Sequence, residues 1–425
     1  MSPHAIPAEA NPFIDLNKFS VTRNAFLPAH SPCEVLSDNC YQPWEIIAQH
    51  LPQHIERGSI RRAVQDLPVL PTDRLRSLSE WRRAYVILAF MTHAYVWGGD
   101  QPEQILPPQI TIPFLQVSEH LELPPVLSYS AANLWNFAST SDDFTDLTSL
   151  RTLCSFTGTE SESWFLLISV AMEARGAEII NTMTEAIGAI RTRDYETITT
   201  ALEQLRDCIR GVGILLDRMY ERCDPMTFYH KIRPFLAGSK NMAAAGLPKG
   251  VFYDEGNGEG EWRQLRGGSN GQSSMIQFFD VVLGVDHKGN GDSSTAPVEK
   301  SFHAEVREYM PGPHARFLVH VSRMGSIREL ALLPPSTPGQ HRLRAAYTAA
   351  TEALAEFRNK HIQIVTRYIV LPSRQSTSNG ARRNLASSSS TQKTTQELTG
   401  TGGTALIPFL KQSRDETAFA GQLDQ

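Results

Sequence analysis

His361 stands on the apolar stripe of the longest helical pattern in this 425-residue chain. Phe357 and Val365 flank it at a spacing of one helical turn. A neutral imidazole that faces a dry cavity is a good axial ligand for haem iron. A core histidine that hydrogen-bonds a backbone carbonyl would give the same pattern and is the more common case. The helix pattern alone leaves both interpretations open.

A glycine-rich segment, LRGGSNGQSS (265–274), precedes the apolar run MIQFFDVVLGV (275–285). Gly267, Gly268 and Gly271 allow the backbone to approach a flat ligand closely, and the helix start offers free N–H groups. The segment has neither the GK[ST] of a Walker loop nor a GxGxxG after a strand. A ligand site and an ordinary loop with a helix N-cap are therefore both compatible with it.

Two further segments offer side chains that could line a pocket. In DPMTFYHKIRPFL (224–236), Phe228 could form an aromatic wall and Arg233 could bind a carboxylate. Most arginines, however, are solvated surface groups. Phe165 and Ser169 are four residues apart and share one helix face, although a serine in such an apolar segment can simply bond back to its own helix. HExxH and DxDxDG motifs are absent, so neither a zinc-protease site nor an EF-hand calcium loop is indicated.

Helical periodicity dominates the elements that must hold these residues, and we expect an all-α fold. Helices are predicted within 58–98, 128–138, 161–190, 195–223 and 342–371. Prolines set the expected limits: Pro234 should stop a short helix that begins after Asp224, and Pro372 should end the long one. The proline-rich segment 101–125 should contain only short helices or extended pieces.

Composition and charge exclude several classes of protein. Hydrophobic residues make up 41% of the chain, as in a soluble globular protein with a substantial core. The formal net charge of −5 argues against a generally basic nucleic-acid binder. No segment approaches the roughly 20 apolar residues that cross a bilayer, and residues 1–13 do not resemble a secretory signal. Five cysteines, odd in number and never in CxxC, indicate a reduced, cytoplasmic protein.

Residues 373–400 differ in composition from the rest of the chain, because Ser, Thr, Gln, Asn and Gly dominate them. Such a segment cannot bury enough apolar surface to offset the entropy lost on ordering, so we expect a mobile loop. Apolar periodicity returns in residues 400–411.

Taken together, the sequence resembles the indoleamine 2,3-dioxygenase family, in particular its fungal type. The matching segments are SFTGTESESWFLLISVAMEA (155–174), RPFLAGSKN (233–241), GGSNGQSSMIQFFDVVLGV (267–285), YMPGPHARFL (309–318), FRNKHIQIVTRYIVLP (357–372) and GTGGTALIPFLK (400–411). They keep the family's order and roughly its spacing from about residue 30 to 412. The combination of HIQIVTRYI with GGSxGQSS is far more specific than a single histidine, and it favours the haem-ligand interpretation of His361.

The resemblance implies a monomeric, all-helical haem b protein that is active as Fe(II). A small N-terminal domain, residues 1–152, and a larger C-terminal domain, residues 153–425, would enclose the haem between them. The implied reaction inserts both atoms of O₂ across the indole C2–C3 double bond of L-tryptophan. The product is N-formyl-L-kynurenine, on the kynurenine route towards NAD.

Roles around the haem follow from the motif positions. His361 would be the proximal iron ligand. Gly268, Ser269 and Asn270 would lie against the haem edge, where some family members have alanine in place of Asn270. Ser169 would supply a hydroxyl on the oxygen-binding side.

Substrate contacts are implied in the same way. Phe165 and Phe228 would pack the indole, with Tyr129 deeper in the pocket. Arg233 would pair with the substrate carboxylate, and Thr401 would help to hold the amino-acid moiety.

The sequence departs from the family beside Tyr129, where Ala132 and Asn133 replace Cys-Val and change the volume and polarity of the pocket. An alternative of another class remains: a haem-binding protein of the same fold that senses haem or a gas and turns over little or no tryptophan. Retention of Arg233, Phe228, Phe165 and Ser169 favours the enzyme.

Overall fold

A computed structural model describes residues 14–287, 302–375 and 406–423, and it confirms the predicted, mainly helical architecture. The α-helices are α1 Gln42–Gln49, α2 Leu51–Glu56, α3 Ile60–Gln65, α4 Leu78–Trp97, α5 Pro108–His120, α6 Glu160–Arg175, α7 Ala177–Gly188, α8 Tyr195–Asp217, α9 Met219–Arg222, α10 Pro225–Thr227, α11 Arg233–Leu236, α12 Ser274–Leu283, α13 Phe302–Arg307, α14 Gly312–Met324, α15 Ile327–Leu332, α16 Pro338–Val365, α17 Leu371–Ser373 and α19 Leu406–Ala420. Short 3₁₀ turns are η1 Leu16–Phe19, η2 Asn39–Tyr41, η5 Ala243–Ala245 and η6 Asn270–Gln272. Three turns are π-helical: η3 Ser130–Leu134, η4 Phe228–Ile232 and η7 Thr366–Val370.

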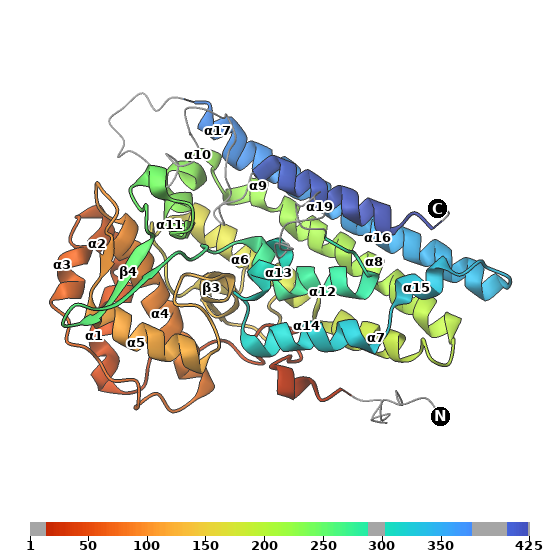
Figure 1. Ribbon diagram of the computed structural model, residues 1–425, viewed down its shortest axis with the longest axis horizontal. Coiled ribbons are helices and arrows are strands. Elements are labelled where there is room, and N and C mark those ends of the chain that lie inside the picture. Colours follow the sequence, from red (N-terminus) through yellow and green to blue (C-terminus); the bar gives the residue numbers. More distant parts are fainter. Residues whose placement is uncertain (1–13, 288–301, 376–405, 424–425) are drawn as a thin grey trace, which may run out of the picture.

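The helices form two groups in Figure 1. Helices α1 to α5 gather at one end, around the almost wholly buried α4. At the other end α16 runs along both α8 and α19 and is the longest described helix. Thr337 and Gln340 form a capping box at the start of α16, so the helix begins four residues before the predicted 342. The long helices α8 and α16 supply a rigid frame for this part of the molecule.

Two small sheets complete the described fold, β1 Ile105–Leu106 with β4 Val251–Gly256 and β5 Glu259–Arg263, and β2 Phe137–Ser139 with β3 Leu150–Thr152. The β4–β5 hairpin was not predicted. Asn257 and Gly258 both have positive φ, as a two-residue hairpin turn requires, so the Asn-Gly pair was the missed signal. Because β4 pairs with β1 in parallel, this later segment packs against the N-terminal helices.

Several predicted helices have different limits in the structure. The expected helix 161–190 is divided into α6 and α7 at Gly176, where a Cβ would collide with the Met275 side chain. The proline-rich segment 101–125 contains the 13-residue α5, because Pro107 and Pro108 initiate the helix rather than prevent it. The segment 128–138 forms the π turn η3 and strand β2 instead of one short helix.

The helices extend two residues beyond the predicted stop at Pro234 and one residue beyond that at Pro372, and the same local structure explains both. Each proline follows a π-helical turn, in which Arg233 N–H bonds Phe228 O and Leu371 N–H bonds Thr366 O, five residues back. A proline lacks the N–H for the helical ladder and its ring crowds the preceding turn. The wider π turn accommodates this crowding, so the chain stays helical to Leu236 and Ser373.

His93 links helix α4 to Phe235 in α11 and to Leu127 in the segment before η3. Its Nδ1 donates to the Phe235 carbonyl at 2.6 Å, and its Nε2 accepts from the Leu127 N–H at 3.1 Å. Only a neutral imidazole can donate at one nitrogen and accept at the other. Burial lowers the pKa of His93 to about 4, although the hydrogen bond to Phe235 opposes the shift.

We expect His93 to make the protein sensitive to acid. Because its pKa is lower folded than unfolded, its contribution is present above about pH 6.5 and is lost as the pH falls towards 4. The loss should be about 2–3 kcal/mol by pH 4.5. Urea unfolding at pH 7 and 4.5 measures it. His93→Gln keeps a donor and an acceptor but does not titrate, so it should flatten this dependence, whereas His341→Gln at an exposed position should not. An unchanged slope in His93→Gln would contradict the assignment.

Candidate active site

A deep cavity lies among α6, α8, α12, α16 and α19, and the segment 267–273 bounds it. Its empty space, counted together with the open mouth, is about 1860 Å³. Its walls are mostly apolar, with these lining residues in the long helices: Phe165, Leu166, Ile168, Met172, Val212, Leu216, Phe357, Ile364, Val365, Leu406, Phe409 and Leu410. Such walls exclude water from whatever occupies the cavity.

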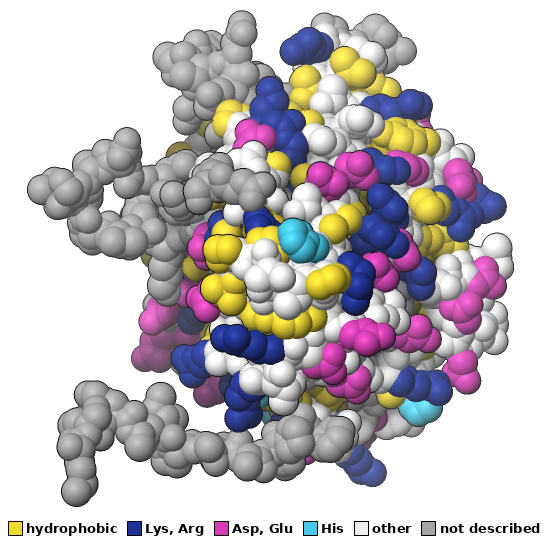
Figure 2. Space-filling model, turned by 90° about the vertical axis from the view of Figure 1, so that its right-hand side faces the viewer, with side chains coloured by type: hydrophobic (Ala, Val, Ile, Leu, Met, Phe, Trp, Pro, Cys, Tyr) yellow, Lys and Arg dark blue, Asp and Glu magenta, His cyan; other side chains and the backbone are white. Residues whose placement is uncertain are grey.

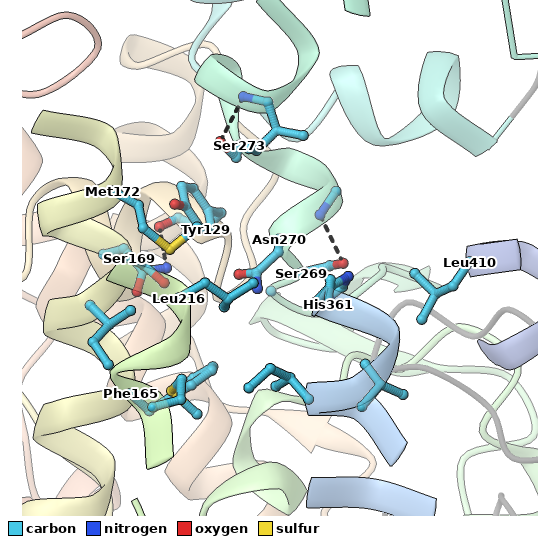
Figure 3. A pocket seen from close by; sticks show the side chains of 18 of the residues that line it. Tyr129, Phe165, Ser169, Met172, Leu216, Ser269, Asn270, Ser273, His361 and Leu410 are labelled. Carbon is cyan, nitrogen blue, oxygen red and sulfur yellow. Dashed lines mark hydrogen bonds between the residues drawn. The ribbon is translucent and has the colours of Figure 1, made fainter. Parts of the chain in front are cut away.

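Of the ten residues to which the family resemblance gives a role, nine line this one cavity: Tyr129, Phe165, Ser169, Phe228, Arg233, Gly268, Ser269, Asn270 and His361. They come from segments more than 200 residues apart in the chain. Figure 3 shows Tyr129 and Ser169 together on one side, and His361 with Ser269 on the other. Thr401 lies outside the described residues, as does the predicted mobile loop except for its first three residues.

The His361 imidazole projects from α16 into the cavity and makes no hydrogen bond with any residue that the structure describes. It therefore lacks the backbone carbonyl partner of an ordinary core histidine. Burial, and to a lesser degree the charge of Arg358, lower its pKa to about 4. The ring is neutral at pH 7, and a nitrogen lone pair is available to a ligand in the cavity.

The glycine segment passes very close to neighbouring backbone before it reaches the cavity. A Cβ on Gly267 would collide with the carbonyl oxygen of Leu236, so only glycine fits there. Gln272 holds the segment in place: its Oε1 accepts from the Tyr129 N–H at 2.8 Å, and its Nε2 donates to Gly267 O at 2.8 Å. Gly268 consequently presents bare backbone to the cavity.

Aromatic side chains and one arginine form the wall beside α6. Phe165 and Phe228 meet edge to face with ring centroids 4.9 Å apart, and Phe228 packs against Tyr368 at 5.8 Å. Arg233 is buried, and its guanidinium lies over the Tyr229 ring at 5.6 Å. Burial lowers the pKa of Arg233, whereas Tyr229 opposes this shift. The wall thus places a buried cation next to a surface suited to a flat ring.

Sequence reasoning missed a buried carboxyl group in the cavity wall. Glu173 lies one turn after Ser169 on α6, and its Oε1 accepts from the Ser273 hydroxyl at 2.5 Å. Burial raises the pKa of Glu173 to about 7. Burial and then the nearby Glu173 raise the pKa of Tyr129, while Ser273 and Ser169 oppose them. A glutamate placed between Met172 and Ala174, directly after the apolar run of α6, was the available signal.

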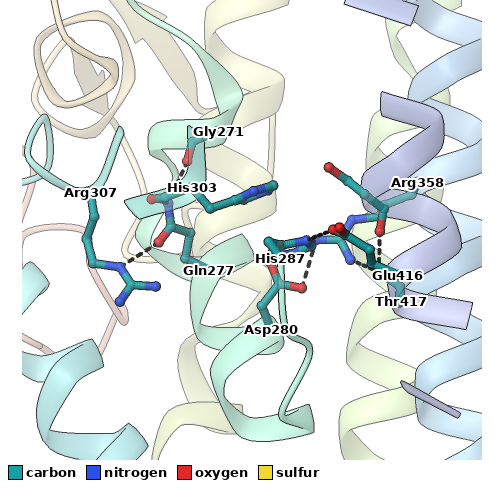
Figure 4. Close-up of polar contacts among 10 residues, drawn as sticks. Gly271, Gln277, Asp280, His287, His303, Arg307, Arg358, Glu416 and Thr417 are labelled. Carbon is teal, nitrogen blue, oxygen red and sulfur yellow. Dashed lines mark hydrogen bonds and ion pairs between the residues drawn. The ribbon is translucent and has the colours of Figure 1, made fainter. Parts of the chain in front are cut away.

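A buried network of charges connects α16 with α19 (Figure 4). Arg358, one turn before His361, donates to both oxygens of Asp280 at 2.7 and 2.8 Å. His287 lies between Asp280, at 3.2 Å, and Glu416 of α19, at 2.7 Å. Burial alone would lower the pKa of His287, but the two carboxylates raise it overall. Since α19 also lines the cavity, the network ties one wall to the helix that carries His361.

The cavity suits a large planar prosthetic group. It offers a neutral imidazole without a partner among the described residues, a segment of bare glycine backbone and apolar walls. This combination is typical of the class of helical haem proteins with a histidine ligand.

Comparison with known proteins identifies the family. The indoleamine 2,3-dioxygenase family model matches residues 15–420. The chain is 39% identical to the indoleamine 2,3-dioxygenase nanC of Aspergillus nanangensis, over 96% of this chain and 98% of that protein. It is also 39% identical to the indoleamine 2,3-dioxygenase of Saccharomyces cerevisiae, over 96% and 94%. The 6-hydroxytryptophan 2,3-dioxygenase fscD of Fusarium equiseti is 38% identical, over 92% and 94%.

The chain therefore belongs to the indoleamine 2,3-dioxygenase family, whose members are haem-dependent oxidoreductases that act on indole substrates with O₂. On the face in Figure 2, Lys and Arg side chains are interspersed with Asp and Glu. All five cysteines are free. Among the described helices, none is both long and apolar enough to span a bilayer.

Proposed function

We propose that this protein converts L-tryptophan and O₂ to N-formyl-L-kynurenine. The observation that carries the proposal is the convergence of His361, Arg233 and the Phe165–Phe228 pair on one largely apolar cavity. An imidazole for iron, a cation for a carboxylate and aromatic walls for an indole are the three features that this reaction requires of the protein. Haem, when bound, supplies the oxygen chemistry.

On the haem side, His361 would hold the iron, because its imidazole is neutral and projects into the cavity. Gly268 would let the ring edge approach the backbone, and Ser269 and Asn270 would border that edge. Arg358 would hold the His361 helix through its buried ion pair with Asp280.

On the substrate side, Arg233 would bind the carboxylate and so orient the amino acid. Phe165 and Phe228 would hold the indole ring, with Tyr129 at the deeper end. Thr401 would contact the amino-acid moiety. The apolar side chains around them would keep water out, so that the Arg233–carboxylate attraction is strong.

Turnover under defined conditions tests the proposal. The haem-loaded protein is reduced, mixed with O₂ and L-tryptophan, and N-formylkynurenine is identified by mass spectrometry. Incorporation of both atoms from ¹⁸O₂ establishes dioxygenation. A normal haem spectrum without product from any indole amino acid would favour the alternative, a haem-binding or gas-sensing protein of the same fold.

We expect Ser169→Ala to reduce turnover only modestly, by less than about 100-fold. The hydroxyl lies next to Tyr129 in the cavity wall, where it can tune polarity. Among the described residues it has no charged hydrogen-bond partner that would make it an acid or base. Steady-state kinetics at constant haem content measures the effect. Loss of all turnover with intact haem would instead assign Ser169 an essential role in proton transfer.

We further propose a division of the chain at about residue 152, into the small and large domains that flank the haem. A monomer in the cytoplasm is our corresponding expectation, and the five free thiols support a reducing compartment. Limited proteolysis tests the division, and light scattering coupled to size exclusion tests the oligomeric state.

A further inference from the structure

Three side chains that can bind a metal ion meet near the end of α12: Asp280, His287 and His303. Each offers one ligand atom, a carboxylate oxygen or an imidazole nitrogen, and these atoms all lie within 4.8 Å of one another. Asp280 and His287 are buried, with 6% and 7% of their side chains exposed. The ligand atoms around one tetrahedral Zn²⁺ are about 3.4 Å apart, so small side-chain movements bring all three residues to one ion.

A reversal of the chain after α12 returns His287 to Asp280. Gly284 ends the helix with a φ of 61°, and the Val285 N–H donates to the Asp280 carbonyl at 2.9 Å. His287 Nε2 consequently lies 3.2 Å from Asp280 Oδ2. This separation is close to that of two ligand atoms on one ion.

The surroundings of Asp280 and His287 resemble the second sphere of a metal site. His287 Nδ1 lies 2.7 Å from a carboxylate oxygen of Glu416, so it can donate there while Nε2 faces Asp280. Metal-binding histidines almost always donate their other ring N–H to a carboxylate, a carbonyl or water, which fixes the ring. Arg358 orients Asp280 by donating to both of its oxygens. Its positive charge opposes a cation, but the two carboxylates outweigh it.

His303 distinguishes a metal site from an ordinary ion network. A protonated His287 between two carboxylates would account for Asp280 and Glu416, but it gives His303 no role. The His303 ring stacks on His287 with ring centroids 3.7 Å apart (Figure 4), and it makes no hydrogen bond with any residue that the structure describes. Burial and the nearby His287 lower the pKa of His303 to about 3, so a lone pair is available to a metal ion.

We propose that Asp280, His287 and His303 bind a divalent transition-metal ion of the Zn²⁺ type, and that this ion fastens α13 to the end of α12. Imidazole and carboxylate are ligands that Zn²⁺ accepts, and a water molecule would complete four-coordination. The ion replaces the proton that His287 Nε2 shares with Asp280, and this proton is released to solvent. Since His303 also lines the cavity, the ion would stabilise one part of the cavity wall.

Zinc binding to the haem-loaded protein tests the proposal. Haem keeps His361 and the cavity occupied, and EDTA followed by dialysis removes other metal. Equilibrium dialysis with Zn²⁺ and elemental analysis should then give one tightly bound zinc per chain. X-ray absorption at the zinc edge, which iron does not obscure, should show imidazole ligands. Hydrogen exchange in α13, Phe302–Arg307, should slow when zinc is added.

Two variants remove one ligand each. His303→Phe keeps a ring that can stack on His287, and His287→Gln keeps a polar group between the carboxylates. Each should weaken zinc binding at least about 10-fold, because even second-sphere changes cost that much. His341→Gln, at an exposed position of α16, is the matched control and should bind zinc as the unmodified protein does.

The proposal is overturned if the unmodified protein retains no zinc, as when a haem carboxylate pairs with His303 instead. It is also overturned if either variant binds zinc undiminished, if the bound zinc shows no imidazole ligands, or if exchange in α13 is unchanged. Tryptophan turnover plays no part in these measurements, so their result is independent of the proposed function.

Discussion

His361→Ala should purify with at least about 10-fold less haem than the unmodified protein, because even second-sphere changes at metal sites cost that much affinity. His361 is the neutral imidazole that α16 directs into the cavity. Its removal leaves iron without an axial partner and opens a gap in the helix face. The haem-to-protein ratio, measured by the pyridine haemochrome method, reports the loss.

Two controls separate ligation from folding. His341→Ala removes an exposed histidine from the same helix and should keep its full haem content. Free imidazole fits the space that His361→Ala creates, so it should restore haem binding to that variant. If His361→Ala retained a full Soret band and the ligand spectra of the unmodified protein, His361 would not be the ligand.

Helices α8 and α16, the second of which carries His361, could be predicted because their signals are local. In both, apolar residues recur at steps of three and four, and the structure confirms both helices. The return of apolar periodicity at 400–411 indicated order near α19 but not where this helix would pack. Phe409 and Leu410 of α19 line the same cavity. The position of α19 depends on packing against α16, a contact that sequence periodicity does not encode.

The π-helical turns show why the fine geometry of the site could not be predicted. Local rules treat Pro234 and Pro372 as helix stops. Packing of Phe228 and Tyr368 against each other fixes the turns that precede these prolines. The extra residue in each turn changes which side chains face the cavity, and π turns are frequent at functional sites for this reason.

Residue identity alone also could not reveal the groups that hold the site together. Gln272 and Ser273 belong to a motif, but their partners, Tyr129 and Glu173, lie 100 residues or more away in the chain. The family resemblance predicted nine residues that line the cavity. Glu173 was recognised as part of the site only from its burial and its raised pKa in the structure.

Arg233→Ala should separate substrate recognition from haem binding. The guanidinium is buried in the cavity wall, so a carboxylate that binds there loses little of the attraction to solvent screening. We expect kcat/KM for L-tryptophan to fall by roughly 30- to 1,000-fold, or about 2–4 kcal/mol, with haem content close to that of the unmodified protein. Arg233→Lys should recover only part of the loss, since an ammonium cannot reproduce a bidentate fork.

Tryptamine provides the sharpest control, because it keeps the indole and lacks the carboxylate. Its kcat/KM should fall far less than that of L-tryptophan when Arg233 is replaced. Lys231→Ala, which removes an exposed cation from the neighbouring turn η4, should leave both substrates unaffected. Equal losses for tryptamine and L-tryptophan, or loss of haem from Arg233→Ala, would show that Arg233 and its contact with Tyr229 maintain the fold rather than bind the substrate.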